Sequence, residues 1–260
     1  MRSRFGFTVI FACLLFLSSA VMASAQTLTV YCGAGLMHPM DELKARFEKT
    51  HPGTTLQMIY SGSGELFGTI AVRKAGDVFV PGSEKEIDDA LDKGFVIEET
   101  IRPLCFHVPV ILVPADNPGK VRSLEDLARP GLRLGLADEK AASIGKVGLA
   151  LLKKNGLDEA VQANCVVRPS TVNQLLIYAA TGQVDAVLAW EDQALWGEAA
   201  GKVTTVQIPF EKNVIKTVPA AVVSFTQERE LAQAFVDFLA SSEAKSVWSK
   251  WGFPTEKPRS

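Results

Sequence analysis

Short apolar runs alternate with amphipathic segments along the chain, and turns rich in Gly, Ser and Pro separate them. The apolar stretch 28–32, a helical pattern at 40–49 and a second apolar stretch at 56–60 form a βαβ unit. The alternation continues to the C-terminus, which predicts an α/β fold. Further strands are expected at 76–82, 132–136, 165–168, 185–190 and 203–208, and further helices at 65–73, 84–93, 123–128, 144–154, 169–180, 228–239 and 242–251.

Two longer apolar runs, 103–114 and 217–224, each contain a central proline. A proline cannot donate to a strand ladder, so each run indicates an edge or a change of sheet. We interpret the runs as two crossings between two lobes, with hinges at 106–109 and 218–221. The expected fold is a two-lobed clamshell with a central cleft, in which 26–106 and 220–260 form lobe I and 107–219 form lobe II.

Residues 1–25 have the pattern of a signal peptide. Arg2 and Arg4 give a basic start, 7–17 is an apolar run too short for a comfortable membrane span, and Ala23-Ser24-Ala25 is an A-x-A cleavage site. We therefore expect cleavage after Ala25 and an exported, periplasmic protein without a lipid anchor.

The charge balance argues against nucleic acid or an anionic membrane surface as a partner. The chain carries 27 basic and 29 acidic residues, and loss of Arg2 and Arg4 leaves 25 and 29, a formal net charge of −4. A mildly acidic protein does not attract polyanions through its overall field. An anionic ligand would have to be held by local dipoles.

Four turns between a predicted strand and a predicted helix are rich in Ser, Gly and Ala. They span 33–38, 61–64, 141–145 and 170–172, and none contains Lys or Arg. The start of a helix leaves N–H groups unpaired and carries the positive end of the dipole, so it can hold an anion. Because ligands of open α/β sheets bind at the carboxyl ends of strands, these turns predict a cleft for a small oxyanion.

Catalytic motifs are scarce. The chain has three histidines, and no G-x-S-x-G, H-E-x-x-H or C-x-x-C pattern occurs. Donors for an anion are plentiful, whereas acid–base and nucleophilic pairs are not. The sequence therefore predicts a binding protein that is not an enzyme and needs no cofactor.

At this point the sequence resembles the periplasmic molybdate-binding proteins of ABC transporters, within the type II periplasmic binding-protein superfamily. The resemblance extends over nearly all of the chain after residue 25. Its signposts are Tyr31-Cys-Gly-Ala-Gly-Leu, Tyr60-Ser-Gly-Ser-Gly, Gly76-Asp-Val-Phe-Val, Gly182-Gln-Val-Asp-Ala-Val-Leu and Trp251-Gly-Phe.

The resemblance implies a set of ligand-binding positions. Ser63 matches a family serine that supplies a hydroxyl and an N–H, and Ile144 and Val172 match backbone N–H donors at helix starts. Two positions depart from the family pattern. Gly35 stands where the family has an anion-binding serine, and Trp190 stands where it has a tyrosine, so an indole N–H replaces a hydroxyl.

Three more residues complete the candidate anion site. Ser61 and Ser143 lie in the same turns as the matched positions. Glu191 follows Trp190 and would repel an oxyanion if it faced the cleft. Two interpretations of Glu191 stay open. It caps the next helix, or its carboxylate coordinates the metal atom of the bound oxyanion, as carboxylates do in tungstate-binding relatives.

A second hypothesis is a site for a soft metal or metalloid. Cys32, His38, Cys105 and His107 lie with Met37 near the first turn or the first crossing. Thiolate, thioether and imidazole suit Cu(I), Zn or a metalloid. The alternatives are buried strand cysteines with solvent-facing histidines, or an anion site in which His38 or His107 donates.

The resemblance implies the function. We expect a monomeric, exported protein that captures molybdate or tungstate between the helix N-termini of two lobes, by closure of the hinge. It would deliver the anion to the membrane permease of an ABC importer.

Overall fold

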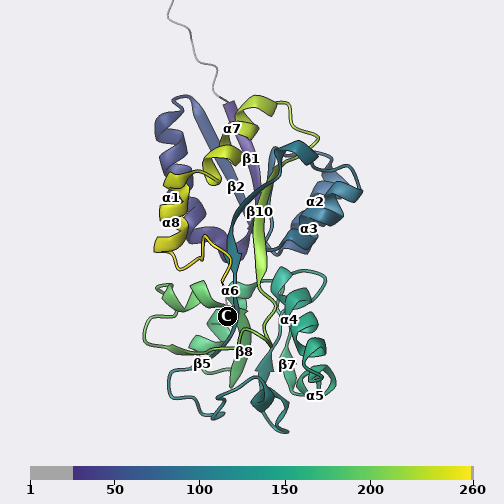
Figure 1. Cartoon of the computed structure of the whole chain (residues 1–260), viewed down its shortest axis with the longest axis vertical. Coiled ribbons are helices and arrows are strands. Elements are labelled where there is room, and N and C mark those ends of the chain that lie inside the picture. The colour runs from purple at the N-terminus through teal and green to yellow at the C-terminus, as the bar shows by residue number, and fades with distance from the viewer. Residues whose placement is uncertain (1–25, 259–260) are drawn as a thin grey trace, which may run out of the picture.

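Residues 26–258 are described by a computed structural model, and they form two α/β lobes, one above the other in Figure 1. The first sheet has the strand order β2-β1-β3-β10-β4, and the second has the order β7-β6-β8-β5-β9. This arrangement confirms the predicted two-lobed α/β fold. The expected signal peptide and its cleavage after Ala25 lie outside the described residues.

The first lobe is built on three parallel strands and an antiparallel pair. The parallel strands are β1 (Gln26–Gly33), β2 (Thr54–Ser61) and β3 (Val78–Val80), and the antiparallel pair is β4 (Arg102–His107) and β10 (Lys216–Val222). Its helices are α1 (Met37–Thr50), α2 (Ser63–Arg73), α3 (Glu84–Asp92), α7 (Arg229–Leu239) and α8 (Ser242–Lys250), with short 3₁₀ turns η1 (Ala34–Leu36) and η2 (Glu98–Thr100).

The second lobe repeats the plan with shorter strands. They are β5 (Pro109–Pro114), β6 (Leu134–Gly135), β7 (Cys165–Val167), β8 (Ala186–Trp190) and β9 (Val203–Val206). Its helices are α4 (Ser143–Lys154), α5 (Asp158–Ala163) and α6 (Val172–Ala180), with 3₁₀ turns η3 (Glu125–Ala128) and η4 (Glu191–Leu195). The sequence pattern missed α5, which has only six residues and one buried side chain, Val161.

Alternating strand residues give the first lobe a core on each face of its sheet. Val30 and Cys32 belong to the cluster that α1, α7 and α8 cover with Phe47, Phe235 and Trp248. Tyr31 points to the other face, in the cluster that α2 and α3 cover with such residues as Leu66 and Ile87. A parallel strand buried on both faces is nearly continuous in hydrophobicity, as β1 is from Val30 to Cys32.

The first crossing is confirmed in position, whereas the second lies elsewhere. β4 and β5 are separated only by Val108 and belong to different sheets. The predicted second hinge at 218–221 falls inside β10, where Val218 and Pro219 pair with β4 in the first sheet. The chain instead passes between the sheets over 207–215. Pro219 marks a shift of register within β10, which is where a strand tolerates a proline.

Because the second crossing lies before residue 216, the boundary between the lobes also differs from the expected one. The prediction placed residues up to 219 in lobe II and those from 220 onward in lobe I. The strand β10 begins at Lys216, which pairs with His107. Residues 216–219, and His107 itself, therefore form part of the sheet of the first lobe.

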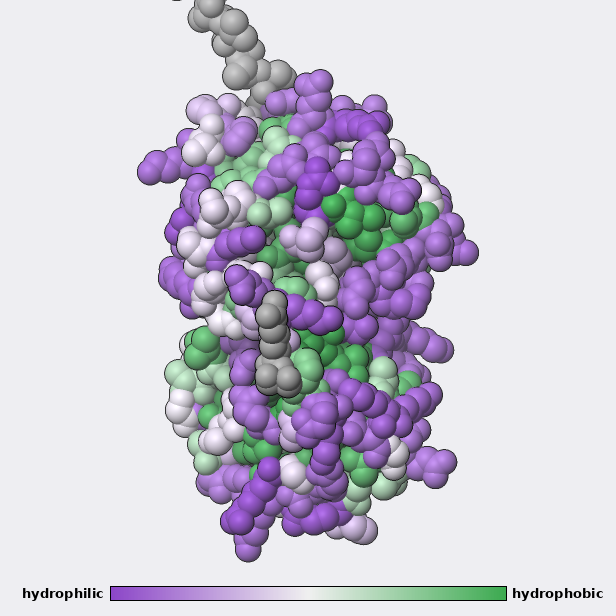
Figure 2. All heavy atoms as spheres, in the orientation of Figure 1, coloured by the Kyte–Doolittle hydropathy of each residue, from purple (hydrophilic) through white to green (hydrophobic). Residues whose placement is uncertain are grey.

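Among residues 26–258, no helix combines the length and the apolar character that crossing a membrane would require. Figure 2 shows mostly hydrophilic residues on one face of the molecule, with hydrophobic residues visible on the upper lobe and near the middle.

The two lobes meet backbone to backbone at the start of α2. Gly64 N–H of the first lobe donates to Ala141 O of the second at 2.8 Å. A Cβ on Gly64 would lie 1.8 Å from Lys140 O, and a Cβ on Gly62 would lie 2.4 Å from the carbonyl oxygens of Ala141 and Ser170. These glycines are therefore required by close approach of the lobes.

We predict that Gly64→Ala forces the lobes apart, because the atoms that its Cβ meets are backbone and cannot rotate away. Small-angle X-ray scattering should give a larger radius of gyration than for the unsubstituted protein. Gly68→Ala is the matched control on the same helix, since its Cβ meets nothing within 4 Å. Ala in a helix interior is also favoured over Gly by about 1 kcal/mol. Equal scattering of the two variants would contradict the prediction.

Candidate oxyanion site

A small cavity of about 20 Å³ lies where the carboxyl ends of strands from both sheets meet. The volume is little above the ~10–15 Å³ that holds one water molecule, so the cavity suits a ligand of few heavy atoms. Its lining includes members of all four predicted turns. The lining residues are Gly33, Ala34, Gly35, Leu36, Ser61, Gly62, Ser63, Gly82, His107, Ala142, Ser143, Ile144, Thr171, Val172 and Trp190.

Three helices and a 3₁₀ turn begin at this cavity. They are α2, which starts at Ser63, α4, which starts at Ser143, α6, which starts at Val172, and η1, which starts at Ala34. The first N–H groups of a helix have no intrahelical acceptor and form the positive end of the dipole. The lining contains no Lys, Arg, Asp or Glu. The cavity therefore offers neutral N–H donors from both lobes to an anion.

Ser63 and Thr171 are the hydroxyl residues of the lining whose protons are not donated within the described residues, and Ser63 is the buried one. Its side chain is buried, and its Oγ accepts the N–H of Gly82 at 2.9 Å. A hydroxyl that accepts one hydrogen bond keeps its own proton for another partner. The sequence pattern predicted that the helix α2 begins at residue 65. The helix starts at Ser63 instead, Gly62 is its N-cap, and no side chain caps it.

Two further serines of the predicted set have their protons engaged elsewhere. Ser61 Oγ donates to the carboxylate of Glu65, and Ser143 Oγ donates to Glu86 Oε2 at 2.9 Å. A hydroxyl has one proton, so neither side chain donates to a ligand in this arrangement. Ser143 still stands at the first position of α4, where its N–H has no intrahelical acceptor.

Gly35 and Trp190 are close neighbours in the wall of the cavity. A Cβ on Gly35 would lie 3.1 Å from Val172 Cγ1 and 3.3 Å from Trp190 Cδ1. The indole of Trp190 is 2 % exposed and stacks on His107, with ring centroids 4.3 Å apart. The large indole therefore occupies space that a side chain at position 35 would need.

His107 belongs to the wall as a neutral imidazole. Its Nδ1 lies 2.8 Å from Gly82 O, and because a carbonyl only accepts, Nδ1 carries the proton. Burial lowers the pKa of His107 from 6.5 to about 4, although the hydrogen bond to Gly82 acts in the opposite direction. At neutral pH the ring thus adds no charge to the site.

Asp192, from η4 of the second lobe, lies behind His107. His107 Nε2 and Asp192 Oδ1 are 3.9 Å apart, and both side chains are almost fully buried. Burial raises the pKa of Asp192 well above its ordinary value of 3.8, and nearby Glu191 acts in the same direction. A raised pKa favours the neutral acid, so this carboxyl group opposes an anion in the cavity less than an ionised one would.

Seven of the eight predicted anion-site residues line this one cavity, and Glu191 does not. The Glu191 carboxylate accepts a hydrogen bond from Gln207 Nε2 at 2.8 Å, on the exposed side of η4. Glu191 is the first residue of η4, Trp190 is the N-cap, and no side chain caps the turn, so the structure does not support the capping interpretation. The structure therefore does not bring Glu191 to the ligand as the coordination hypothesis requires.

The four predicted soft-metal residues are not brought together. Cys32 and Cys105 are free thiols in the core of the first lobe, and burial raises the pKa of both well above 9.0. His38 stacks on Trp251 near the surface, while His107 faces the cavity. Within residues 26–258 no cluster of three or more His, Cys, Asp or Glu could hold a metal ion. This placement does not support the soft-metal hypothesis.

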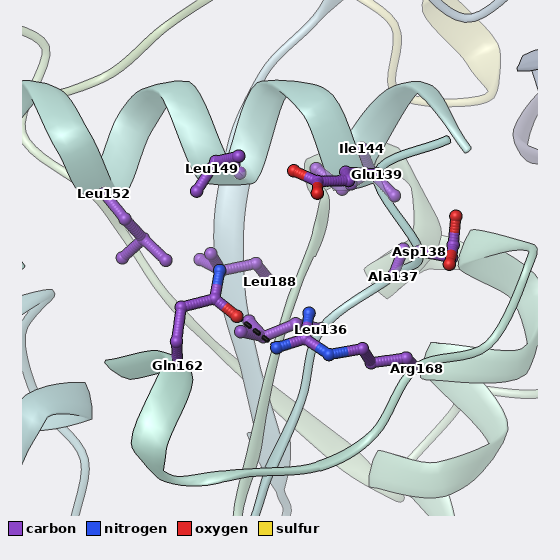
Figure 3. A pocket seen from close by; sticks show the side chains of 12 residues that line it. Leu136, Ala137, Asp138, Glu139, Ile144, Leu149, Leu152, Gln162, Arg168 and Leu188 are labelled. Atoms are coloured by element: carbon purple, nitrogen blue, oxygen red, sulfur yellow. Dashed lines mark hydrogen bonds between the residues drawn. The ribbon is translucent and has the colours of Figure 1, made fainter. Parts of the chain in front are cut away.

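A larger cavity of about 300 Å³ lies inside the second lobe, beneath α4 (Figure 3). Leu136, Leu149, Leu152 and Leu188 form much of its wall, and Arg168 reaches across it to bond Gln162. Its size and its leucine-rich wall suit a larger and less polar molecule than an oxyanion. The small cavity between the lobes is therefore the better candidate for the predicted site.

Sequence reasoning missed Gly82, which shapes the small cavity. Gly82 follows β3 and binds both Ser63 and His107 through its backbone. A Cβ on Gly82 would lie 3.2 Å from Ser143 Oγ in the other lobe. Gly82 follows the strand β3, which is next to β1 in the sheet, and this position could have indicated that it lies near the ends of the other strands.

The geometry defines a class of protein: two α/β lobes that enclose a small, uncharged, donor-lined cavity. The family model described as bacterial extracellular solute-binding protein matches residues 28–254. The chain belongs to this family. Because the family is one of solute-binding proteins, the prediction that the protein is not an enzyme is confirmed.

Individual relatives agree with this assignment. The molybdate-binding protein ModA of Mycobacterium tuberculosis is 26% identical over 229 residues, which cover 88% of this chain and 85% of ModA. The periplasmic molybdate-binding protein of Azotobacter vinelandii is 21% identical, with a TM-score of 0.75, and 89% of this chain covers 100% of it. The sulfate-binding protein SubI of M. tuberculosis is 22% identical, with a TM-score of 0.78, over 89% of this chain and 88% of SubI.

We predict that His107 makes the stability of the ligand-free protein depend on pH between about 6.5 and 4. In this range the unfolded state binds a proton that folded His107, with a pKa of about 4, does not bind. Stability is therefore complete above pH 6.5 and is lost as the pH falls, by about 3 kcal/mol in total.

Denaturant unfolding across this pH range should show the loss in the unsubstituted protein, and His107→Gln should lack this part of it. Gln can still donate to Gly82 O but does not titrate. The carboxyl groups are the same in both proteins, so the difference between the two curves isolates His107. Parallel curves would contradict the prediction.

Proposed function

We propose that the protein captures a small tetrahedral oxyanion, molybdate or tungstate, in the cavity between its lobes. The single observation that carries the proposal is the convergence of α2, α4 and α6 and the Ser63 hydroxyl on a cavity without a charged side chain. Dipoles fixed in a water-excluded site stabilise an anion without a counter-cation.

The chemistry of the lining favours a fully deprotonated anion. No carboxylate lines the cavity, so nothing strong accepts a proton from a ligand such as hydrogen phosphate. Molybdate, tungstate and sulfate carry no proton near neutral pH. The molybdate-binding relatives support the group-six anions, and the sulfate-binding protein of the same fold makes sulfate the necessary comparison.

The proposal extends to transport. The family is extracellular, and similar proteins include one named as the substrate-binding domain of a molybdenum ABC transporter. We propose that the exported protein, cleaved after Ala25, acts as a monomer and passes its anion to the membrane permease of an ABC importer. Two lobes joined by two crossings can close over a ligand and reopen at a partner.

We predict that the melting temperature of the mature protein rises with molybdate or tungstate and does not rise with phosphate. A ligand at a hundredfold its dissociation constant adds about 2.7 kcal/mol to the stability of the folded state. Sulfate is tested in parallel, so that the rise in melting temperature can be compared between anions of different size. If none of the tetrahedral dianions raises the melting temperature, the proposed ligand class is wrong.

Ser63→Ala should weaken the binding of the best anion by about 10- to 100-fold, because it removes a hydrogen bond to a charged group. Isothermal titration calorimetry measures the change. Ser61→Ala is the matched control: Ser61 also lines the cavity, but its proton is donated to Glu65. Equal affinities of the two variants would show that the Ser63 hydroxyl does not donate to the anion.

A further inference from the structure

A buried carboxylate joins the two lobes next to the oxyanion cavity without lining it. Glu86 belongs to α3 of the first lobe and is 1 % exposed. Its Oε2 accepts from Ser83 Oγ at 2.6 Å within its own lobe and from Ser143 Oγ at 2.9 Å in the other lobe. Its Oε1 lies 3.1 Å from Lys146 Nζ, also in the other lobe.

The two partners of Glu86 in the second lobe stand on the first turn of α4. Ser143 begins that helix, and Ile144 between them lines the cavity. Glu86 thus holds the end of α4 whose N–H groups face the ligand position. Because the hydroxyl proton of Ser143 is donated to Glu86, Ser143 contributes to the site through its backbone N–H.

The Glu86 side chain is buried, whereas that of Lys146 is about one third exposed, so loss of Lys146 leaves a buried carboxylate without its cation. A buried charge left without its partner is strongly destabilising, whereas replacing both members with neutral groups is often nearly neutral. The pair here forms only when the lobes are together, because Glu86 and Lys146 lie on different lobes. Asp89 is the other acidic group facing Lys146, with Oδ2 at 3.9 Å, and it is itself bonded to Lys85.

We propose that Glu86 is a positioning residue for ligand binding: through Ser143 and Lys146 it holds the start of α4 in the closed arrangement of the lobes. It raises the affinity of the cavity without touching the ligand. The inference rests on the proposed function in that the small cavity is taken as the ligand site. It does not depend on which oxyanion the cavity holds.

The chain contains a matched control two residues away on the same helix. Glu84 accepts from Lys216 Nζ at 3.0 Å and from Thr217 N–H at 2.9 Å. Both partners belong to β10, in the same lobe as Glu84. Glu84→Gln therefore weakens a glutamate–lysine pair that is more exposed than that of Glu86, and it changes no contact between the lobes.

The first experiment compares binding of the anion that the unsubstituted protein prefers. Glu86→Gln should dissociate its anion about tenfold faster, whereas Glu84→Gln should stay within about twofold of the unsubstituted protein. Lys146→Met should bind more weakly than Glu86→Gln, because it leaves the Glu86 carboxylate buried without its cation. The double variant Glu86→Gln/Lys146→Met should bind more tightly than Lys146→Met alone, which a purely additive role would not produce.

A second readout needs no ligand, so it separates a failure of this inference from a failure of the proposed function. The N–H of Gly64 is bonded to Ala141 O of the other lobe. In ligand-free protein, deuterium exchange of the peptide containing Gly64 should be faster in Glu86→Gln than in Glu84→Gln. Equal exchange and equal dissociation in these two variants, or additive effects in the double variant, would overturn the proposal.

Discussion

An anion held without a counter-cation needs several N–H donors pointing at one place, and neither lobe of this protein supplies all of them. The first lobe brings the starts of η1 and α2, and the second brings the starts of α4 and α6. These ends can converge only if the backbones of the two lobes touch. Gly62 and Gly64 make that contact possible, since a Cβ at either would overlap carbonyl groups of the other lobe. The fold of each lobe, the glycines and the crossings all serve this convergence.

The absence of charge from the lining has a second consequence, which concerns the groups just behind it. His107 is kept neutral by burial, and the raised pKa of Asp192 favours its neutral form. The ionic groups Glu86 and Lys146 lie outside the lining and neutralise each other. Fixed dipoles therefore decide the electrostatics of the cavity, and full charges act through position, by holding the elements that carry the dipoles.

The features that could be predicted from sequence are local, and those that could not are contacts between distant segments. Ser63 was found because a small-residue turn between a strand and a helix is a short-range pattern. Glu86 gave no such signal, because its partner Ser143 is 57 residues away and on the other lobe. Glu191 was considered as a ligand because it follows Trp190, but the chain turns into η4 there and the carboxylate points toward Gln207. The second crossing was misplaced because the apolar run 217–224 is mostly a strand buried in the first sheet. The chain crosses between the lobes in the segment before this strand.

Gly35 and Trp190, the two positions at which the sequence departs from the pattern expected from the resemblance, constrain each other in three dimensions. A serine at position 35 would place its Cβ 3.3 Å from the Trp190 indole and 3.1 Å from Val172, tighter than most such contacts. The absence of a side chain at Gly35 therefore leaves room for the Trp190 indole. At these two positions the wall carries no hydroxyl group: Gly35 has only backbone groups, and Trp190 has an indole N–H. Among the serines of the lining, Ser63 is the one whose proton is not donated within the described residues. The N–H groups at the helix ends therefore contribute a larger share of the hydrogen bonds that select the anion.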